Sequence, residues 1–230
     1  ATPFPACALK KSPRRFFPAG NVRFTLKTEA TFPAEKAAAA NAASAAAVTD
    51  MAKISLKNLR FSKKRNLAEN KAAAAEQGFP QCGAFSADGF IEEQNRLGFL
   101  RCGARPADYC GCGFIAAYNL LHIVKRPAKI PELISEFEHG LVLGGVFGTS
   151  PIFMLRFLRK NFAFAKLFLK KSSFLKSNPQ KGVIFYMRRD FSAHYVAFSR
   201  EKDGLFRFYN YRGTGFCQCM EDFFREKNRR

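Results

Sequence analysis

The hydrophobic pattern changes character near residue 79. Before that point the apolar residues are mostly alanine with scattered phenylalanine, and Leu, Ile and Val are too few to build a core. Prolines, basic pairs and two alanine tracts are typical of a disordered segment with marginal helices near 37–57 and 67–77. We therefore expect residues 1–78 to form a disordered basic leader, and residues 79–230 to form one folded domain.

Helical patterns dominate the first half of the expected domain. An almost unbroken apolar run over 112–125 predicts a buried helix. Shorter runs over 131–137 and 151–159 begin with proline, a residue that suits the first helical turn. The glycine-rich stretch 144–148 lies between these runs and predicts a loop.

The last third of the chain has the pattern of strands. Short runs over 182–187, 194–199 and 205–209 are rich in β-branched and aromatic residues. Asp203-Gly204 separates the last two runs, and this dipeptide is a strong hairpin signal. Helices followed by an antiparallel meander indicate an α+β fold, in which a central helix packs on an antiparallel sheet.

Three residues in chain order suggest thiol chemistry. Cys112 stands at the start of the apolar helix, where unpaired main-chain N–H groups favour a thiolate. His194 begins a predicted strand and is the candidate base, and Asn210 follows the next strand and is the candidate orienting residue. Antiparallel pairing across the hairpin would bring residues near 210 alongside 194–197. Each of the three also has a purely structural interpretation, as a buried small thiol, a strand histidine and a turn asparagine.

The motifs around these residues resemble a known superfamily. Cys112-Gly-Phe-Ile-Ala-Ala-Tyr-Asn-Leu-Leu, then His194-Tyr-Val-Ala-Phe and Phe208-Tyr-Asn210, resemble the papain-like cysteine peptidases. Within that superfamily the chain looks most like the bacterial bacteriocin-processing, double-glycine-leader peptidases. The resemblance covers roughly 95–215, and it implies a papain-like α+β fold, a Cys-His-Asn triad and a peptide or protein substrate. It implies no cofactor.

The chain departs from this family at three places. The family usually has a glutamine a few residues before the nucleophile, which completes the oxyanion hole, whereas here Gln94 is the candidate and lies further upstream. Cys110 is also followed by glycine and is an alternative nucleophile, although the sequence after Cys112 fits the family's helix better. Asn210 stands where many relatives have aspartate. The sequence is therefore compatible with both an active and an inactive papain-like enzyme.

The seven cysteines bear on the cellular setting and on metals. An odd number excludes complete internal pairing, so we expect free thiols and a reducing, cytoplasmic location. The pairs Cys110/Cys112 and Cys217/Cys219 leave zinc open as an alternative, although one intervening residue is a poor spacing for it.

Charge supports a second function class. The formal net charge is +20, which favours polyanions as partners. A non-enzymatic basic module that binds nucleic acid, in particular through the leader, is therefore the alternative to a thiol enzyme. No apolar stretch reaches the length of a membrane span, so we expect none.

Overall fold

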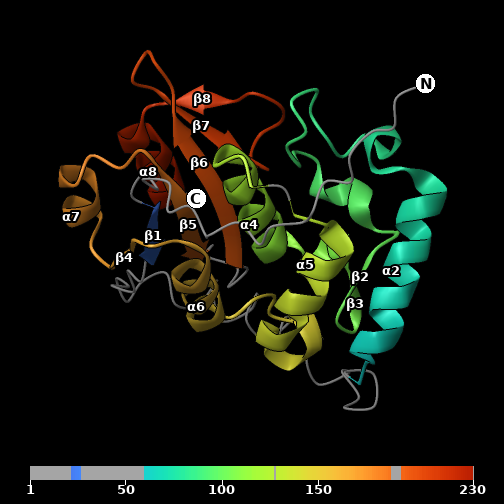
Figure 1. The fold of residues 1–230 in the computed structure, drawn as a ribbon. Coiled ribbons are helices and arrows are strands. Elements are labelled where there is room, and N and C mark those ends of the chain that lie inside the picture. Colours follow the sequence, from blue (N-terminus) through green and yellow to red (C-terminus); the bar gives the residue numbers. More distant parts are fainter. Residues whose placement is uncertain (1–21, 27–59, 127, 188–192, 230) are drawn as a thin grey trace, which may run out of the picture.

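One sheet of six strands stands beside a group of helices (Figure 1). The structure is a computed structural model, and it describes residues 22–26, 60–126, 128–187 and 193–229. The sheet has the order β4-β1-β5-β6-β7-β8. These strands are β1 (Val22–Leu26), β4 (Ala165–Phe168), β5 (Lys181–Met187), β6 (Ala193–Arg200), β7 (Phe206–Tyr209) and β8 (Cys217–Gln218).

The C-terminal part of the sheet is antiparallel, as expected. Strands β5, β6, β7 and β8 pair antiparallel in succession, and the β6–β7 register places Ala197 opposite Tyr209. The hairpin turn contains Gly204, whose φ of 84° suits a residue without a side chain. Strand β1 pairs parallel with both β4 and β5, so the whole sheet is mixed. The sequence did not predict β1 or β4.

The described residues contain seven α-helices. The predicted helices at 112–125, 131–137 and 151–159 are confirmed as α4, α5 and α6, and the expected loop at 144–148 overlaps a tight 3-10 turn, Val142–Gly145. The helices are α2 (Lys63–Gln77), α3 (Ala107–Cys110), α4 (Cys112–Ile123), α5 (Ile130–Phe137), α6 (Pro151–Asn161), α7 (Lys171–Lys176) and α8 (Met220–Arg229).

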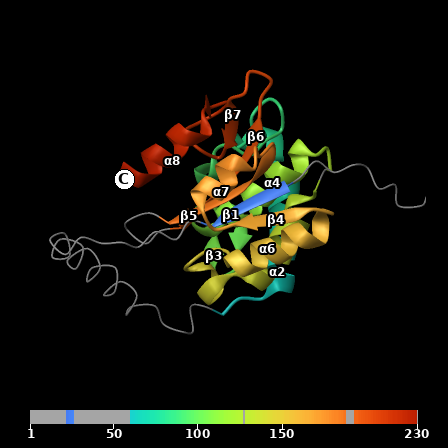
Figure 2. The same cartoon turned by 90° about the vertical axis from the view of Figure 1, so that its left-hand side faces the viewer.

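The two faces of the sheet bury two separate sets of side chains. Successive residues of a strand point to opposite faces. Tyr195 and Ala197 of β6 therefore pack in one cluster with α4, whereas Val196 and Phe198 pack in a second cluster with Phe223 of α8. Figure 2 shows α4 and α8 on opposite sides of the sheet. Both faces of β6 are thus covered, which fixes this strand in the core.

Helix α2 corrects the expected boundary at residue 78. Asn70 of α2 is buried, donates to the carbonyl of Arg101 at 2.8 Å and accepts from the N–H of Arg101 at 2.7 Å. Asn66 is also buried and donates to the carbonyl of Gly103. Buried polar side chains that satisfy main-chain groups belong to a fold, so α2 is part of the domain. The expected helix at 37–57 lies outside the described residues.

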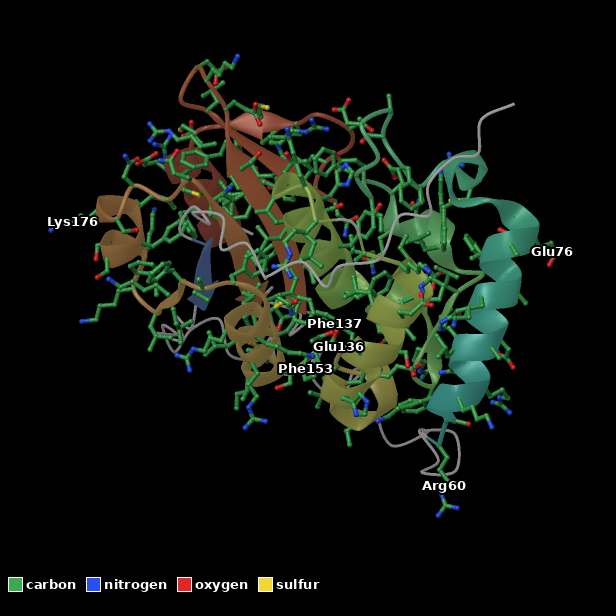
Figure 3. All side chains as sticks on the ribbon, viewed as in Figure 1. Arg60, Glu76, Glu136, Phe137, Phe153 and Lys176 are labelled. Carbon is green, nitrogen blue, oxygen red and sulfur yellow. The ribbon has the colours of Figure 1, made fainter. Side chains whose placement is uncertain are left out.

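Helices α5 and α6 pack together through aromatic rings at the lower end of the molecule. The rings of Phe137 and Phe153 lie 5.3 Å apart, and Glu136 pairs with Lys160 at 2.8 Å on the surface beside them (Figure 3). Within the described ranges, no helix combines the length and the apolar character that crossing a membrane requires.

Candidate active site

Cys112 occupies the first position of α4, as the sequence predicted. The short helix α3 ends at Cys110, and Gly111 keeps a right-handed helical conformation with φ −78°, so α3 leads directly into α4. The Cys112 residue is 6% exposed. The candidate nucleophile is therefore well buried, and the helical turn α3 comes directly before its helix.

The surroundings of the Cys112 sulfur act on its ionisation in opposite directions. Burial, and to a lesser extent the neighbouring Cys110, raises the pKa of the Cys112 thiol, which with all influences together lies at about 11. The main-chain N–H groups of Tyr195, Gly113 and Cys112 point at the sulfur and lower the pKa. The resting thiol is thus neutral, but three N–H donors are already arranged around the position of a thiolate.

Gly113 packs closely against Thr149. A Cβ at Gly113 would stand 2.2 Å from Thr149 Oγ1, so Thr149 fills the space next to this glycine. The carbonyl of Thr149 also accepts from the Tyr195 hydroxyl at 2.9 Å. Thr149 therefore connects the start of α4 to strand β6, a link that the sequence did not reveal.

Cys110, the alternative nucleophile, points elsewhere. Its thiol lies 3.1 Å from the carbonyl of Cys102 and 3.5 Å from that of Pro106. A hydrogen bond with Cys110, together with burial, raises the pKa of the Cys102 thiol. Cys110 thus belongs to a buried pair of thiols beside the β2–β3 hairpin, formed by β2 (Arg101–Cys102) and β3 (Arg105–Pro106). No described hydrogen bond joins it to β6.

His194 lies on β6 directly before Tyr195, whose N–H faces the Cys112 sulfur. Its Nε2 is 3.3 Å from the carbonyl oxygen of Asn210. The β5–β6 register places His194 opposite Tyr186, and their rings lie edge to face at 5.7 Å. The imidazole of His194 thus meets the main chain of Asn210, and the residue after His194 directs its N–H at the Cys112 sulfur.

Asn210 meets His194 through its main chain rather than through its side chain. The sequence predicted that the Asn210 side chain would orient the imidazole. In the structure its Nδ2 donates to Gln94 Oε1 at 3.0 Å, and its Oδ1 accepts from the Gln94 N–H at 3.3 Å. Asn210 has a φ of 59°, a left-handed conformation that Asn tolerates better than most residues. This conformation accompanies the approach of its carbonyl to His194.

The side chain of Gln94 connects two parts of the site by hydrogen bonds. Its Nε2 donates to the carbonyl of Asp108 at 2.7 Å and lies 3.4 Å from that of Ala107. Both carbonyls belong to α3, the turn directly before the nucleophile helix. With its amide donors used in this way, Gln94 joins the Cys112 side of the site to the Asn210 side. The main-chain N–H groups around the sulfur are better placed as oxyanion donors.

Two further polar residues support this region and were missed by sequence reasoning. Glu92 is 3% exposed, and one of its oxygens accepts from the N–H of Asn210 at 2.8 Å. Asn119 of α4 is fully buried, donates to the carbonyl of Ile91 and accepts from the Ile91 N–H, both at 2.8 Å. Apart from an asparagine inside an apolar helix, no sequence signal marks these contacts, because their partners are far away in the chain.

The described cysteines offer no metal centre. All six of them are unpaired thiols. Among the described residues, no group of three or more His, Cys, Asp or Glu side chains is arranged to hold a metal ion. The zinc alternative on Cys110, Cys112, Cys217 and Cys219 therefore gains no support. The leader to which nucleic-acid binding was assigned lies largely outside the described residues.

The region so assembled contains a buried thiol, main-chain N–H donors around its sulfur, and an imidazole on the strand that provides one of these donors. Such a set is suited to nucleophilic acyl chemistry. Comparison of the chain with protein-family models, with curated proteins and with solved structures finds no match.

Proposed function

We propose that this protein is a thiol-dependent enzyme of the papain-like kind, which cleaves or transfers an acyl group from a peptide amide. Cys112 acts as the nucleophile and His194 as the base. The observation that carries the proposal is the position of the Cys112 sulfur against the N–H of Tyr195, the residue directly after His194. The carbonyl of Asn210, 3.3 Å from Nε2 of the imidazole, supports the same assignment of His194.

The reaction follows from the groups present. The imidazole of His194 takes the Cys112 proton, and the thiolate attacks the amide carbonyl carbon. The oxyanion that forms is stabilised by main-chain N–H groups at the start of α4, which already point at the sulfur. The imidazolium then gives its proton to the leaving amine, and the C–N bond breaks to leave a thioester on Cys112. Water or an acceptor amine, deprotonated by His194, releases the acyl group.

The direction of the histidine ring agrees with this scheme. With a proton on Nε2, the ring donates to the Asn210 carbonyl, and Nδ1 then carries the lone pair that a base requires. Imidazolium formation strengthens the same hydrogen bond, because a charged donor binds a carbonyl more strongly than a neutral one. Asn210 thus orients the base through its main chain, so the replacement of aspartate by asparagine at this position leaves the contact available.

Site-resolved alkylation tests the proposal. With its pKa at about 11, an unassisted Cys112 thiol is ionised in only about one molecule in ten thousand at pH 7. An ion pair with the His194 imidazolium lowers the pKa of Cys112 and so raises the fraction of thiolate. We expect iodoacetamide, followed by peptide mass spectrometry, to modify Cys112 faster than the exposed Cys217 at neutral pH. His194→Ala should slow the modification of Cys112 at least a hundredfold and leave that of Cys217 unchanged.

Cys110→Ala is the matched control. It removes a thiol two positions away, and the rate at Cys112 should stay within a few-fold of the original because Cys110 points toward Cys102. Turnover is then measured with a mixture of peptides, comparing the original chain with Cys112→Ser. Preferential modification of Cys217, with a Cys112 rate that does not respond to His194→Ala, would overturn the proposal.

A further inference from the structure

The segment 91–94 connects the two sides of the candidate site. On one side, Asn119 of the nucleophile helix α4 holds both main-chain groups of Ile91. On the other, Gln94 exchanges two hydrogen bonds with the side chain of Asn210. Four consecutive residues therefore tie α4 to the residue whose carbonyl contacts His194. Figure 1 shows α4 directly beside β6 and β7, so the segment spans a short distance.

Glu92 lies in the middle of this segment and is deeply buried. Its side chain is 1% exposed, and every polar contact recorded for it is with a donor. Oε2 accepts from the Asn210 N–H at 2.8 Å, Oε1 pairs with Arg207 Nη2 at 3.3 Å, and the N–H of Gly215 also points at the carboxyl group. A carboxylate only accepts, so these partners are satisfied by the ionised form.

Arg207 provides the counter-charge for this buried carboxylate. Its guanidinium lies 5.0 Å from the centre of the Phe90 ring and 4.9 Å from that of the Tyr209 ring. It also pairs with Asp88 at 3.1 Å at the surface. A buried ion is retained when it is both paired and hydrogen-bonded, and Glu92 meets both conditions. An apolar residue of similar size would leave the Asn210 N–H without this acceptor and Arg207 with Asp88 as its remaining ion-pair partner.

We propose that Glu92 is a positioning residue of the thiol site, which holds the main chain of Asn210 so that its carbonyl receives the imidazole N–H of His194. The inference rests on the proposed function of Cys112 and His194. Asn210 has a left-handed backbone, and Glu92 anchors its N–H while Gln94 anchors its side chain. With the N–H released, the carbonyl is free to turn away from His194, and the imidazolium loses an acceptor.

Several other titratable side chains lie around the site. Tyr186 of β5 lies edge-on to His194, and Cys112 of α4 lies behind Tyr195. Burial raises the pKa of Tyr209, which faces Arg207 on β7. With its pKa raised above the ordinary tyrosine value, Tyr209 stays neutral across the acidic range of a rate profile. We therefore expect the acidic limb of a rate profile to report on the pair formed by Cys112 and His194.

The test is the pH profile of Cys112 alkylation in the full chain, from about pH 4 to about pH 9, with iodoacetamide as the probe. Glu92→Gln keeps the size of the side chain but removes its charge, so the hydrogen bond from the Asn210 N–H and the pairing with Arg207 are both weakened. We expect this variant to lower the Cys112 rate at least tenfold near pH 6, and to shift the acidic limb to higher pH. Glu93→Gln changes the neighbouring carboxyl, whose side chain makes no recorded contact with Asn210, and should reproduce the original profile.

A second variant separates positioning from a loss of folding. Glu92→Gln combined with Arg207→Met removes both buried charges, which is better tolerated than leaving one unpaired. The double variant should unfold cooperatively and still show the shifted profile, with Cys217 modified at its original rate. If either folded variant keeps the original Cys112 profile, the role of Glu92 is refuted. If the original chain shows no selective modification of Cys112, the proposed function itself has failed.

Discussion

Asn119→Ala is the substitution that most directly tests how the nucleophile helix is held. Asn119 is fully buried in α4, and its side chain makes both hydrogen bonds to the main chain of Ile91 at 2.8 Å. Ile91 itself is fully buried, so water cannot replace the lost partner. The substitution leaves one N–H and one C=O without partners in the core.

The expected cost follows from these two groups. An unsatisfied buried donor or acceptor costs about 1–3 kcal/mol, so the pair amounts to about 2–6 kcal/mol in the free energy of unfolding. Typical domains are stable by about 5–15 kcal/mol, and a loss of this size is therefore easily measured. Urea unfolding followed by far-UV circular dichroism gives the difference, because the chain has no tryptophan to report by fluorescence.

Asn161→Ala serves as the control for this measurement. Asn161 is partly buried at the end of α6, and its side chain donates only to the carbonyl of Phe157 in the same helix. Its loss should cost about 1 kcal/mol or less. If the free energy of unfolding of Asn119→Ala lies within about 0.5 kcal/mol of that of the original chain, the two hydrogen bonds of the Asn119 amide do not stabilise the fold. The proposed connection through 91–94 is then refuted.

Two further predictions concern the start of α4 and the buried acid next to α2. Gly113→Ala places a Cβ 2.2 Å from Thr149 Oγ1, so it should destabilise the fold by about 1–3 kcal/mol in urea unfolding. Combining it with Thr149→Ala should cost less than the sum of the two, and strict additivity would contradict the close contact. Burial raises the pKa of the Glu138 carboxyl, whose Oε2 has no hydrogen-bond partner among the described residues. The favourable contribution of Glu138 to the free energy of unfolding is therefore complete below its pKa in the unfolded chain, and it is lost as pH rises through its pKa in the folded chain. Glu138→Gln should therefore gain stability relative to the original chain between about pH 5 and about pH 8. The surface substitution Glu136→Gln is the control and should show no such trend. A stability difference for Glu138→Gln that stays constant with pH would refute the reasoning.

Local patterns were sufficient for three of the helices and for three strands of the antiparallel part of the sheet. The apolar run after Cys112 predicted α4, the proline-led runs predicted α5 and α6, and Asp203-Gly204 predicted the β6–β7 hairpin. These signals succeed because helix period, strand alternation and turn chemistry depend on neighbouring residues. Strand β1 and the docking of α2 were missed, because the alanine-rich composition before residue 79 gave no indication of a partner elsewhere in the chain.

The candidate site shows the same division. Its three principal residues were chosen from their types and their order, and the structure joins His194 to Asn210 and places the Cys112 sulfur against β6. The atoms that make the contacts were not predictable. Asn210 meets His194 through its carbonyl, and Gln94 binds main-chain groups of α3, because a side chain takes whichever partner the packed fold presents.

The sequence by itself determined helices α4, α5 and α6, strands β5, β6 and β7, and the order Cys112, His194, Asn210, because these depend on residue type and local spacing. The tertiary structure decided which cysteine sulfur faces β6, how Thr149 closes on Gly113, and that Glu92 holds Asn210 across a long stretch of chain. The physical reason is the cost of burying polar groups. Each buried N–H and carboxylate needs a partner, and only the assembled core determines which residue, however distant in sequence, provides it.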